Sequence, residues 1–157
     1  TDIQGRIFSF FNRETGSHNF QSDKAIDSIT SGGFFGKGIG EGTLKNRVPE
    51  AHTDYIISVI SEEFGVVAII LILLLFLILI YMVFKKIRFE NDNTIKLILI
   101  GSISLILMQA TIHIGVNIRL LPTTGMTLPF LSYGGSSIVS TSILAGIILN
   151  LTKRKIN

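Results

Sequence analysis

The chain has 157 residues, of which 47% are hydrophobic, and a formal net charge of +3. Its mean hydropathy of +0.55 exceeds what a soluble domain needs, and its apolar residues lie in long blocks, which predicts an integral membrane protein. The small charge, without a single basic patch, excludes nucleic acid as a partner, and the absence of cysteine excludes disulfides and thiolate metal sites.

Residues 1–53 are predicted to form an extracytoplasmic loop with amphipathic segments. Phenylalanines mix with charged residues over 1–20, which fits either a piece lying on a membrane surface or an ordinary polar loop. Residues 21–31 can form about three helical turns, with Ala25, Ile26 and Ile29 on one side. Because the chain starts polar and has no initiator Met, we expect it to be the C-terminal portion of something longer.

Residues 32–42 contain six glycines, a density that forbids a stable helix and allows close backbone approach. The run 36–40 superficially resembles a phosphate loop. It lacks both the Gly-Lys-Ser/Thr ending and a preceding strand, so a nucleotide site is not expected. We interpret the segment as a hinge that also packs against a partner or a substrate.

Acidic residues follow at the mouth of a membrane-spanning pattern. Pro49 suits a first helical turn, and Glu50 and Asp54 share one face of the predicted helix. On a continuous helix Asp54 would stand about 18 Å above the start of the uncharged run at Val66. That height matches the headgroup layer, so we predict that the Asp54 carboxylate acts on the headgroup of a lipid-linked substrate.

Two cations precede this acidic segment. Lys45 and Arg47 lie just before Pro49, where they can receive a pyrophosphate, and arginine offers a bidentate fork. The alternative role is a solvated loop at the lipid surface, which is equally open for Arg47.

Three membrane-spanning helices are predicted at about 54–84, 96–118 and 131–151. Four cations lie in the connection 85–96 and three more at 153–155, which predicts that both are cytoplasmic and that the N-terminal loop is outside. Gln109 and His113 share one face of the second span. Polar residues there are functional candidates, although hydrogen bonds to neighbouring helices are the favoured interpretation.

Residues 121–129 cannot form a regular helix because Pro122 and Pro129 interrupt the backbone ladder. Non-helical backbone near a membrane persists only where protein or water satisfies it. We therefore predict a re-entrant or capping loop folded over a cavity. The small residues of 132–137 then open the third span and allow close helix packing.

Two motifs carry a resemblance to a known family. They are Pro-Glu-Ala-His-Thr-Asp at 49–54 with Glu-Glu-Phe-Gly at 62–65, and Leu-Pro-Thr-Thr-Gly-Met-Thr-Leu-Pro at 121–129 with Ser-Tyr-Gly-Gly-Ser-Ser at 132–137. In them the chain resembles the SEDS family of cell-wall polymerases (the FtsW/RodA/SpoVE group), and the division branch, FtsW, most of all. It departs at His113, where the family usually has Asn, and at Arg119, where Gly is common.

The resemblance covers nearly all of this chain but only about the last third of a typical member. It implies an all-α integral membrane fold, in which a large outer loop with short helices precedes the last three of ten transmembrane helices. It also implies a location in the bacterial cytoplasmic membrane, with the C-terminus cytoplasmic.

The implied activity is that of a cell-division peptidoglycan glycosyltransferase. Such an enzyme polymerises lipid II, a disaccharide-peptide on undecaprenyl pyrophosphate, at the outer face of the membrane. Asp54 aligns with the family's essential loop aspartate and is the implied general base. Lys45, Arg47 or a divalent cation (Mg²⁺ or Mn²⁺) would stabilise the leaving pyrophosphate. Implied partners are a class B penicillin-binding transpeptidase and other division proteins.

The candidate substrate-binding residues come from both motifs and from the cations before them: Lys45, Arg47, Glu50, His52, Thr53, Pro122, Thr124, Gly125, Ser132, Tyr133 and Gly134. For His52, packing or a loop hydrogen bond is the favoured role, and for Asp54 the alternative is a helix-start carboxylate that binds backbone N–H groups. We interpret Glu62 and Glu63 as interfacial anchors or as ion-pair partners of helices outside this chain.

Two rival hypotheses remain. A transporter (flippase) of the lipid-linked precursor would use the polar face of Gln109 and His113 as a path. A decayed or truncated gene product would have no activity, since three helices cannot enclose the cavity that the outer loop is built to cover.

Overall fold

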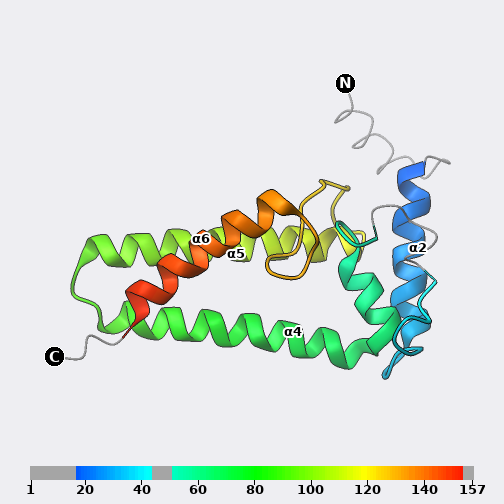
Figure 1. Cartoon of the computed structure of the whole chain (residues 1–157), viewed down its shortest axis with the longest axis horizontal. Coiled ribbons are helices and arrows are strands. Elements are labelled where there is room, and N and C mark those ends of the chain that lie inside the picture. Colours follow the sequence, from blue (N-terminus) through cyan, green and yellow to red (C-terminus); the bar gives the residue numbers. More distant parts are fainter. Residues whose placement is uncertain (1–16, 44–50, 154–157) are drawn as a thin grey trace.

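The computed structural model of the chain describes residues 17–43 and 51–153, with side chains from residue 21 onward. Within these residues it is all-helical, with α2 (Ser17–Gly32), α4 (Ile56–Phe89), α5 (Asn93–Asn117) and α6 (Gly135–Thr152). The long part of α4 runs antiparallel to α5, and α6 crosses from α5 towards the C-terminal end of α4 (Figure 1). Helix α2 lies across the opposite end of this bundle.

Helices α4, α5 and α6 are each long and apolar enough to cross a membrane, which confirms the expected all-α membrane fold with three spans. Helix α4 continues to Phe89, beyond the predicted boundary at 84. Lysine and arginine are good helix formers, and their long stems can lie along apolar surface. Lys86 also pairs with Glu90 at 2.8 Å, and this hydrogen bond lowers the pKa of the Glu90 carboxyl.

Three apolar clusters hold the described elements together, and one of them joins Ile57, Ala110 and Leu128. At the α4–α5 connection end, the buried residues are contributed by all three spans: Val83, Leu99, Ile103, Ile106 and Ile148. At the other end, the cluster joins α2 to the bundle: Ala25, Ala51, Tyr55, Val59 and Val116. The predicted helix at 21–31 is therefore present within α2, and its Ala25 is fully buried.

Helix α4 is broken at Gly65, whose φ of 78° and ψ of −176° are not helical. The break divides it into a short upper helix, residues 56–64, and a long lower helix, residues 66–89. The two helix ends at the break would leave backbone groups without partners. The glycine-rich segment, residues 32–43 and hereafter the glycine loop, supplies them. Its Lys37 and Gly38 N–H groups donate to the carbonyls of Glu62 and Glu63, at 2.9 and 3.1 Å.

Glycine is required where the glycine loop meets the break. A Cβ atom on Gly36 would lie 2.2 Å from the Glu63 carbonyl oxygen, and one on Gly65 would lie 2.2 Å from the Phe34 carbonyl oxygen. Both distances are far inside contact range, and both φ values are positive. Among the described residues, the glycine loop thus packs against the chain's own α4.

The break also overturns the expected continuous helix beneath Asp54. The upper helix lies beside α2 at a sharp angle to the lower helix, and its N-terminal end is near the C-terminal end of α5 (Figure 1). The height of about 18 Å, which assumed an unbroken helix, is therefore wrong. Asp54 instead lies at the C-terminal end of α5, where Asn117 donates a hydrogen bond to its carbonyl.

Candidate functional site

Residues 51–55, hereafter the Asp54 turn, do not form the helix that Pro49 was expected to start. Helix α4 begins at Ile56 with Tyr55 as its N-cap, so Asp54 does not cap it. Three successive carbonyls of the turn accept hydrogen bonds from other segments: His52 from Tyr133 N at 3.1 Å, Thr53 from Ser132 Oγ at 2.8 Å, and Asp54 from Asn117 Nδ2 at 2.9 Å. The turn is held from two sides, by α5 and by the loop before α6.

Asn117, at the end of α5, replaces one hydrogen bond of the helical ladder. In a helix the Asp54 carbonyl would accept from the Ser58 N–H. Here Asn117 Nδ2 donates to the Asp54 carbonyl, and Asn117 Oδ1 accepts from Ser58 N at 3.3 Å and from Ser58 Oγ at 2.8 Å. The Asn117 side chain is 1% exposed. The chain can therefore leave helical geometry at Asp54 without orphaning either backbone group.

His113 lies one helical turn before Asn117 and is equally buried. Its Nε2 is 3.3 Å from the Thr53 carbonyl oxygen, and its Nδ1 is 3.3 Å from Asn117 Nδ2. We assign the hydrogen to Nε2 from this network, because Nδ1 then accepts from the amide. The His113 side chain thus contacts the Asp54 turn directly.

The loop between α5 and α6 is non-helical, as its prolines predict. Gln109, on α5, holds both this loop and α6. Its Nε2 donates to the Thr127 carbonyl of the loop at 2.9 Å and to Ser137 Oγ of α6 at 3.1 Å. Ser132 Oγ accepts from the Leu128 N–H at 2.8 Å. The polar face of α5 is therefore used for hydrogen bonds to neighbouring segments, which was the favoured interpretation of Gln109.

The Asp54 carboxylate meets this loop at Gly125. A Cβ atom on Gly125 would lie 3.9 Å from Asp54 Oδ2, and Gly125 itself has a φ of 69°. Asp54 is half-buried. Asp54 of the first motif and Gly125 of the second, far apart in the sequence, are therefore neighbours in the fold.

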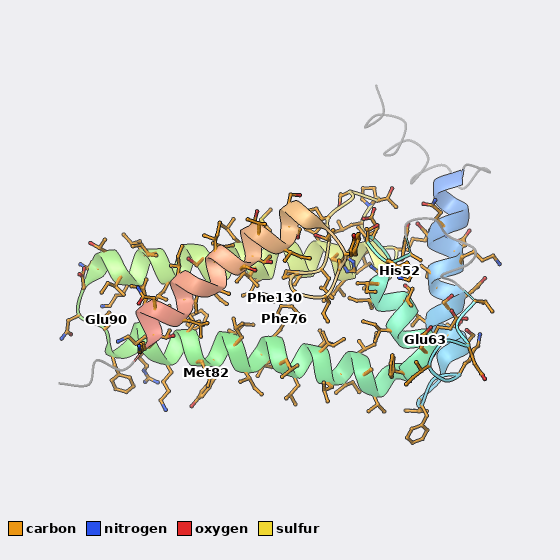
Figure 2. The ribbon with its side chains drawn as sticks, viewed as in Figure 1. His52, Glu63, Phe76, Met82, Glu90 and Phe130 are labelled. Atoms are coloured by element: carbon orange, nitrogen blue, oxygen red, sulfur yellow. The ribbon has the colours of Figure 1, made fainter. Side chains whose placement is uncertain are left out.

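The other candidates fall into two groups. Backbone contacts bring Thr53, Ser132 and Tyr133 together at the turn, although the Tyr133 side chain is 79% exposed. Four more candidates line the same region: half-buried Pro122 and Gly134, and exposed His52 and Thr124. Figure 2 shows His52 at the start of the upper helix and Glu63 at its other end. The candidates Lys45, Arg47 and Glu50 and the amphipathic residues 1–20 lie outside the residues whose side chains are described.

Asn117 is the main residue that sequence reasoning missed. The signal was present, because Gln109, His113 and Asn117 follow one another at intervals of four and so share one stripe of α5. Arg119 has a φ of 58°, in the left-handed region that glycine favours. Its guanidinium pairs with Asp23 of α2.

Glu62 is 1% exposed and belongs to the glycine loop's contacts, not to the Asp54 turn. Lys37 Nζ lies 2.9 Å from Glu62 Oε1, and Thr43 Oγ1 donates to the same oxygen at 3.0 Å. Glu62 therefore has an ion-pair partner within this chain.

Among the described residues, no group of three or more His, Asp or Glu side chains is placed to hold a metal ion. The divalent cation stays a prediction.

The fold and this site define a multi-span helical membrane protein that presents a carboxylate at one end of its bundle. A family model described as a cell cycle protein, FtsW/RodA/SpoVE, matches residues 2–157. The chain belongs to this family.

Among curated proteins, the chain is similar to several described as probable peptidoglycan glycosyltransferase FtsW. The protein of Caulobacter vibrioides is 36% identical over 98% of this chain and 39% of its own length. That of Enterococcus hirae is 40% identical over 87% of this chain and 35% of its own length. That of Bacillus subtilis is 37% identical over 95% of this chain and 38% of its own length. The chain thus spans less than two fifths of these relatives.

A solved structure has the same fold over nearly the whole chain. It comes from work on the structural coordination of polymerization and crosslinking by a peptidoglycan synthase complex. The TM-score is 0.74 at 25% sequence identity, and the match covers 98% of this chain and 42% of that one.

Proposed function

We propose that this chain is the part of a division-type peptidoglycan glycosyltransferase that carries its general base, Asp54. The substrate is lipid II, polymerised into glycan strands at the outer face of the bacterial cytoplasmic membrane. The observation that carries the proposal is that the second family motif packs against the Asp54 turn, through Ser132 and Tyr133 and with Gly125 beside the Asp54 side chain. The relatives' descriptions as peptidoglycan glycosyltransferases support the reaction class.

Asp54 takes one proton in the proposed reaction. The acceptor sugar's hydroxyl gives its proton to an Asp54 carboxylate oxygen while the hydroxyl oxygen forms a bond to the donor's anomeric carbon. The bond from that carbon to the carrier's pyrophosphate breaks, and its electron pair leaves with the phosphate oxygen. The products are a lengthened glycan and free undecaprenyl pyrophosphate.

The contacts around the turn support this role physically. A general base must be held within hydrogen-bond reach of the proton that it removes. Bonds to three consecutive carbonyls, from Tyr133, Ser132 and Asn117, orient the peptide planes on both sides of the Asp54 side chain. Gly125 adds no side chain beside Oδ2.

We propose Lys45 and Arg47 as cations for the leaving pyrophosphate, and a class B penicillin-binding transpeptidase as a partner. The similarity to a chain of a synthase complex that coordinates polymerization and crosslinking supports such a partner. The transporter hypothesis needs the polar face of α5 to line a path. Gln109 and His113 on that face are engaged in hydrogen bonds within the fold, which favours the polymerase.

Asp54→Asn in the complete protein tests the proposal. The amide keeps the shape of the carboxylate but cannot accept a proton, so polymerisation of purified lipid II should fall by about 100-fold or more. The measurement is the yield of glycan strands in detergent or vesicles, at equal membrane insertion. Asp92→Asn is the matched control: Asp92 caps α5 by accepting from Thr94 N at 2.8 Å, and asparagine caps equally well. Polymerisation retained by the Asp54 variant would refute the assignment.

A further inference from the structure

The glycine loop exposes large apolar side chains. Phe34, Phe35 and Ile39 are 76%, 87% and 80% exposed. Lys37 of the loop pairs with Glu62, a carboxylate that is 1% exposed, while the Lys37 side chain itself is 36% exposed. Contiguous apolar patches of this kind mark contacts with protein or membrane. The outer surface of this loop is therefore suited to an apolar medium.

The backbone places the loop at the level where the lower helix begins. The Val66 N–H donates to the Gly33 carbonyl at 3.0 Å, and the Val67 N–H donates to the Phe34 carbonyl at 3.5 Å. The uncharged run of α4 starts at Val66. The loop thus lies beside the first turn of a membrane span, at the depth where the acyl region of a bilayer gives way to headgroups.

The exposed apolar surface continues from the loop onto α4. Phe64, Val66 and Val67 flank the break, and each is at least 36% exposed. Only 6% of the most apolar window of α4 is buried within the described fold. The loop and the helix therefore present one continuous apolar surface. The medium that surrounds the α4 span should also contact the loop.

We propose that the glycine loop is a membrane anchor, whose side chains Phe34, Phe35 and Ile39 insert into the headgroup–acyl boundary of the bilayer. Aromatic side chains favour this layer, and segments bound there bury their apolar face by about 5–10 Å. The buried Glu62 carboxylate stays paired with Lys37. The partner is the lipid bilayer itself, so the anchor does not depend on the proposed reaction.

The proposed anchor is connected to the Asp54 turn through the break in α4 at Gly65. The same loop residues that face lipid also hold the two ends of α4 together across Gly65. The upper helix, which starts at the Asp54 turn, is thereby tied to a fixed depth in the bilayer. The glycine loop replaces the continuous helix as the element that sets the height of Asp54.

A tryptophan scan of the loop in the complete protein tests the anchor: this chain contains no tryptophan, and any tryptophan outside it is replaced by phenylalanine first. Phe35→Trp introduces one indole at an exposed aromatic position, which should leave the fold unchanged by circular dichroism. In phosphatidylcholine vesicles, its emission should lie at short wavelength. Lipids brominated near the carbonyl end of the acyl chain should quench it more than lipids brominated near the methyl end. Iodide in the water should quench it weakly.

Two further variants calibrate the result. Glu41→Trp, at an exposed polar position of the same loop, should be quenched by iodide and not by brominated lipid. Leu74→Trp, at an exposed position within the lower helix, should be quenched most by the deeper bromine. The proposal is overturned if Phe35→Trp behaves like the Glu41 variant, which places it in water. It is equally overturned if neither quencher reaches Phe35→Trp, which shows that protein covers the loop.

Discussion

One side-chain amide beside Asp54 stands in for a backbone hydrogen bond. Asn117 bonds to both the Asp54 carbonyl and the Ser58 N–H, the two groups that an ordinary helix would join. At this scale the motifs identified Asp54 and Ser132 as candidates. They did not identify Asn117, because its role depends on where α5 ends relative to a turn far away in the chain.

Asn117→Ala should destabilise the protein and lower its activity. The change leaves two buried backbone groups unsatisfied, and each such group costs about 1–3 kcal/mol. The unfolding free energy in detergent measures the effect. Asn150→Ala, at an exposed position of α6, is the matched control and should change it by less than about 0.5 kcal/mol. Equal stability of the two variants would contradict the bridging role.

At the scale of elements, α4 is two helices joined through a third segment. Helical pattern reading located the apolar run and its charged end correctly. It missed the break, because a single glycine in an apolar pattern is compatible with an unbroken helix. What breaks the helix is the backbone of the glycine loop, which supplies hydrogen bonds on both sides of Gly65.

Gly65→Ala and Gly101→Ala should have opposite effects on stability. At Gly65, a Cβ atom would meet the Phe34 carbonyl oxygen at 2.2 Å, and the positive φ alone costs about 1–3 kcal/mol. At Gly101, inside α5, a Cβ atom meets nothing within 4 Å, so alanine should gain up to about 1 kcal/mol from its helix propensity. Thermal unfolding in detergent compares them. A Gly65 variant as stable as the Gly101 variant would show that the break is not required.

For the whole molecule, the exposed apolar surface is the dominant feature. The most apolar windows of α4 and α6 are only 6% and 11% buried, whereas that of α5 is 33% buried. Helix α5 is therefore the packed centre of the described region, and the other two spans face the surrounding membrane or other protein. This arrangement places the polar stripe of α5 where it can hold the Asp54 turn.

The predicted orientation of the chain can be tested directly, because it has no cysteine. Cations on both sides of the α4–α5 connection predict that Asp92 is cytoplasmic, and the Thr124 loop then lies outside. In intact cells, a membrane-impermeant maleimide should label Thr124→Cys and should label Asp92→Cys only after permeabilisation. The reverse pattern would overturn the orientation, and with it the proposed outer-face reaction.

The amino-acid sequence by itself determined the three helices long and apolar enough to span a membrane and the non-helical proline loop. These features follow from local composition and periodicity, which act over a few turns of chain. Tertiary structure alone decided the break at Gly65 and the hold of Asn117 on Asp54. Both depend on backbone groups whose partners lie in another element, and a periodic pattern carries no information about which distant segment satisfies an unpaired carbonyl.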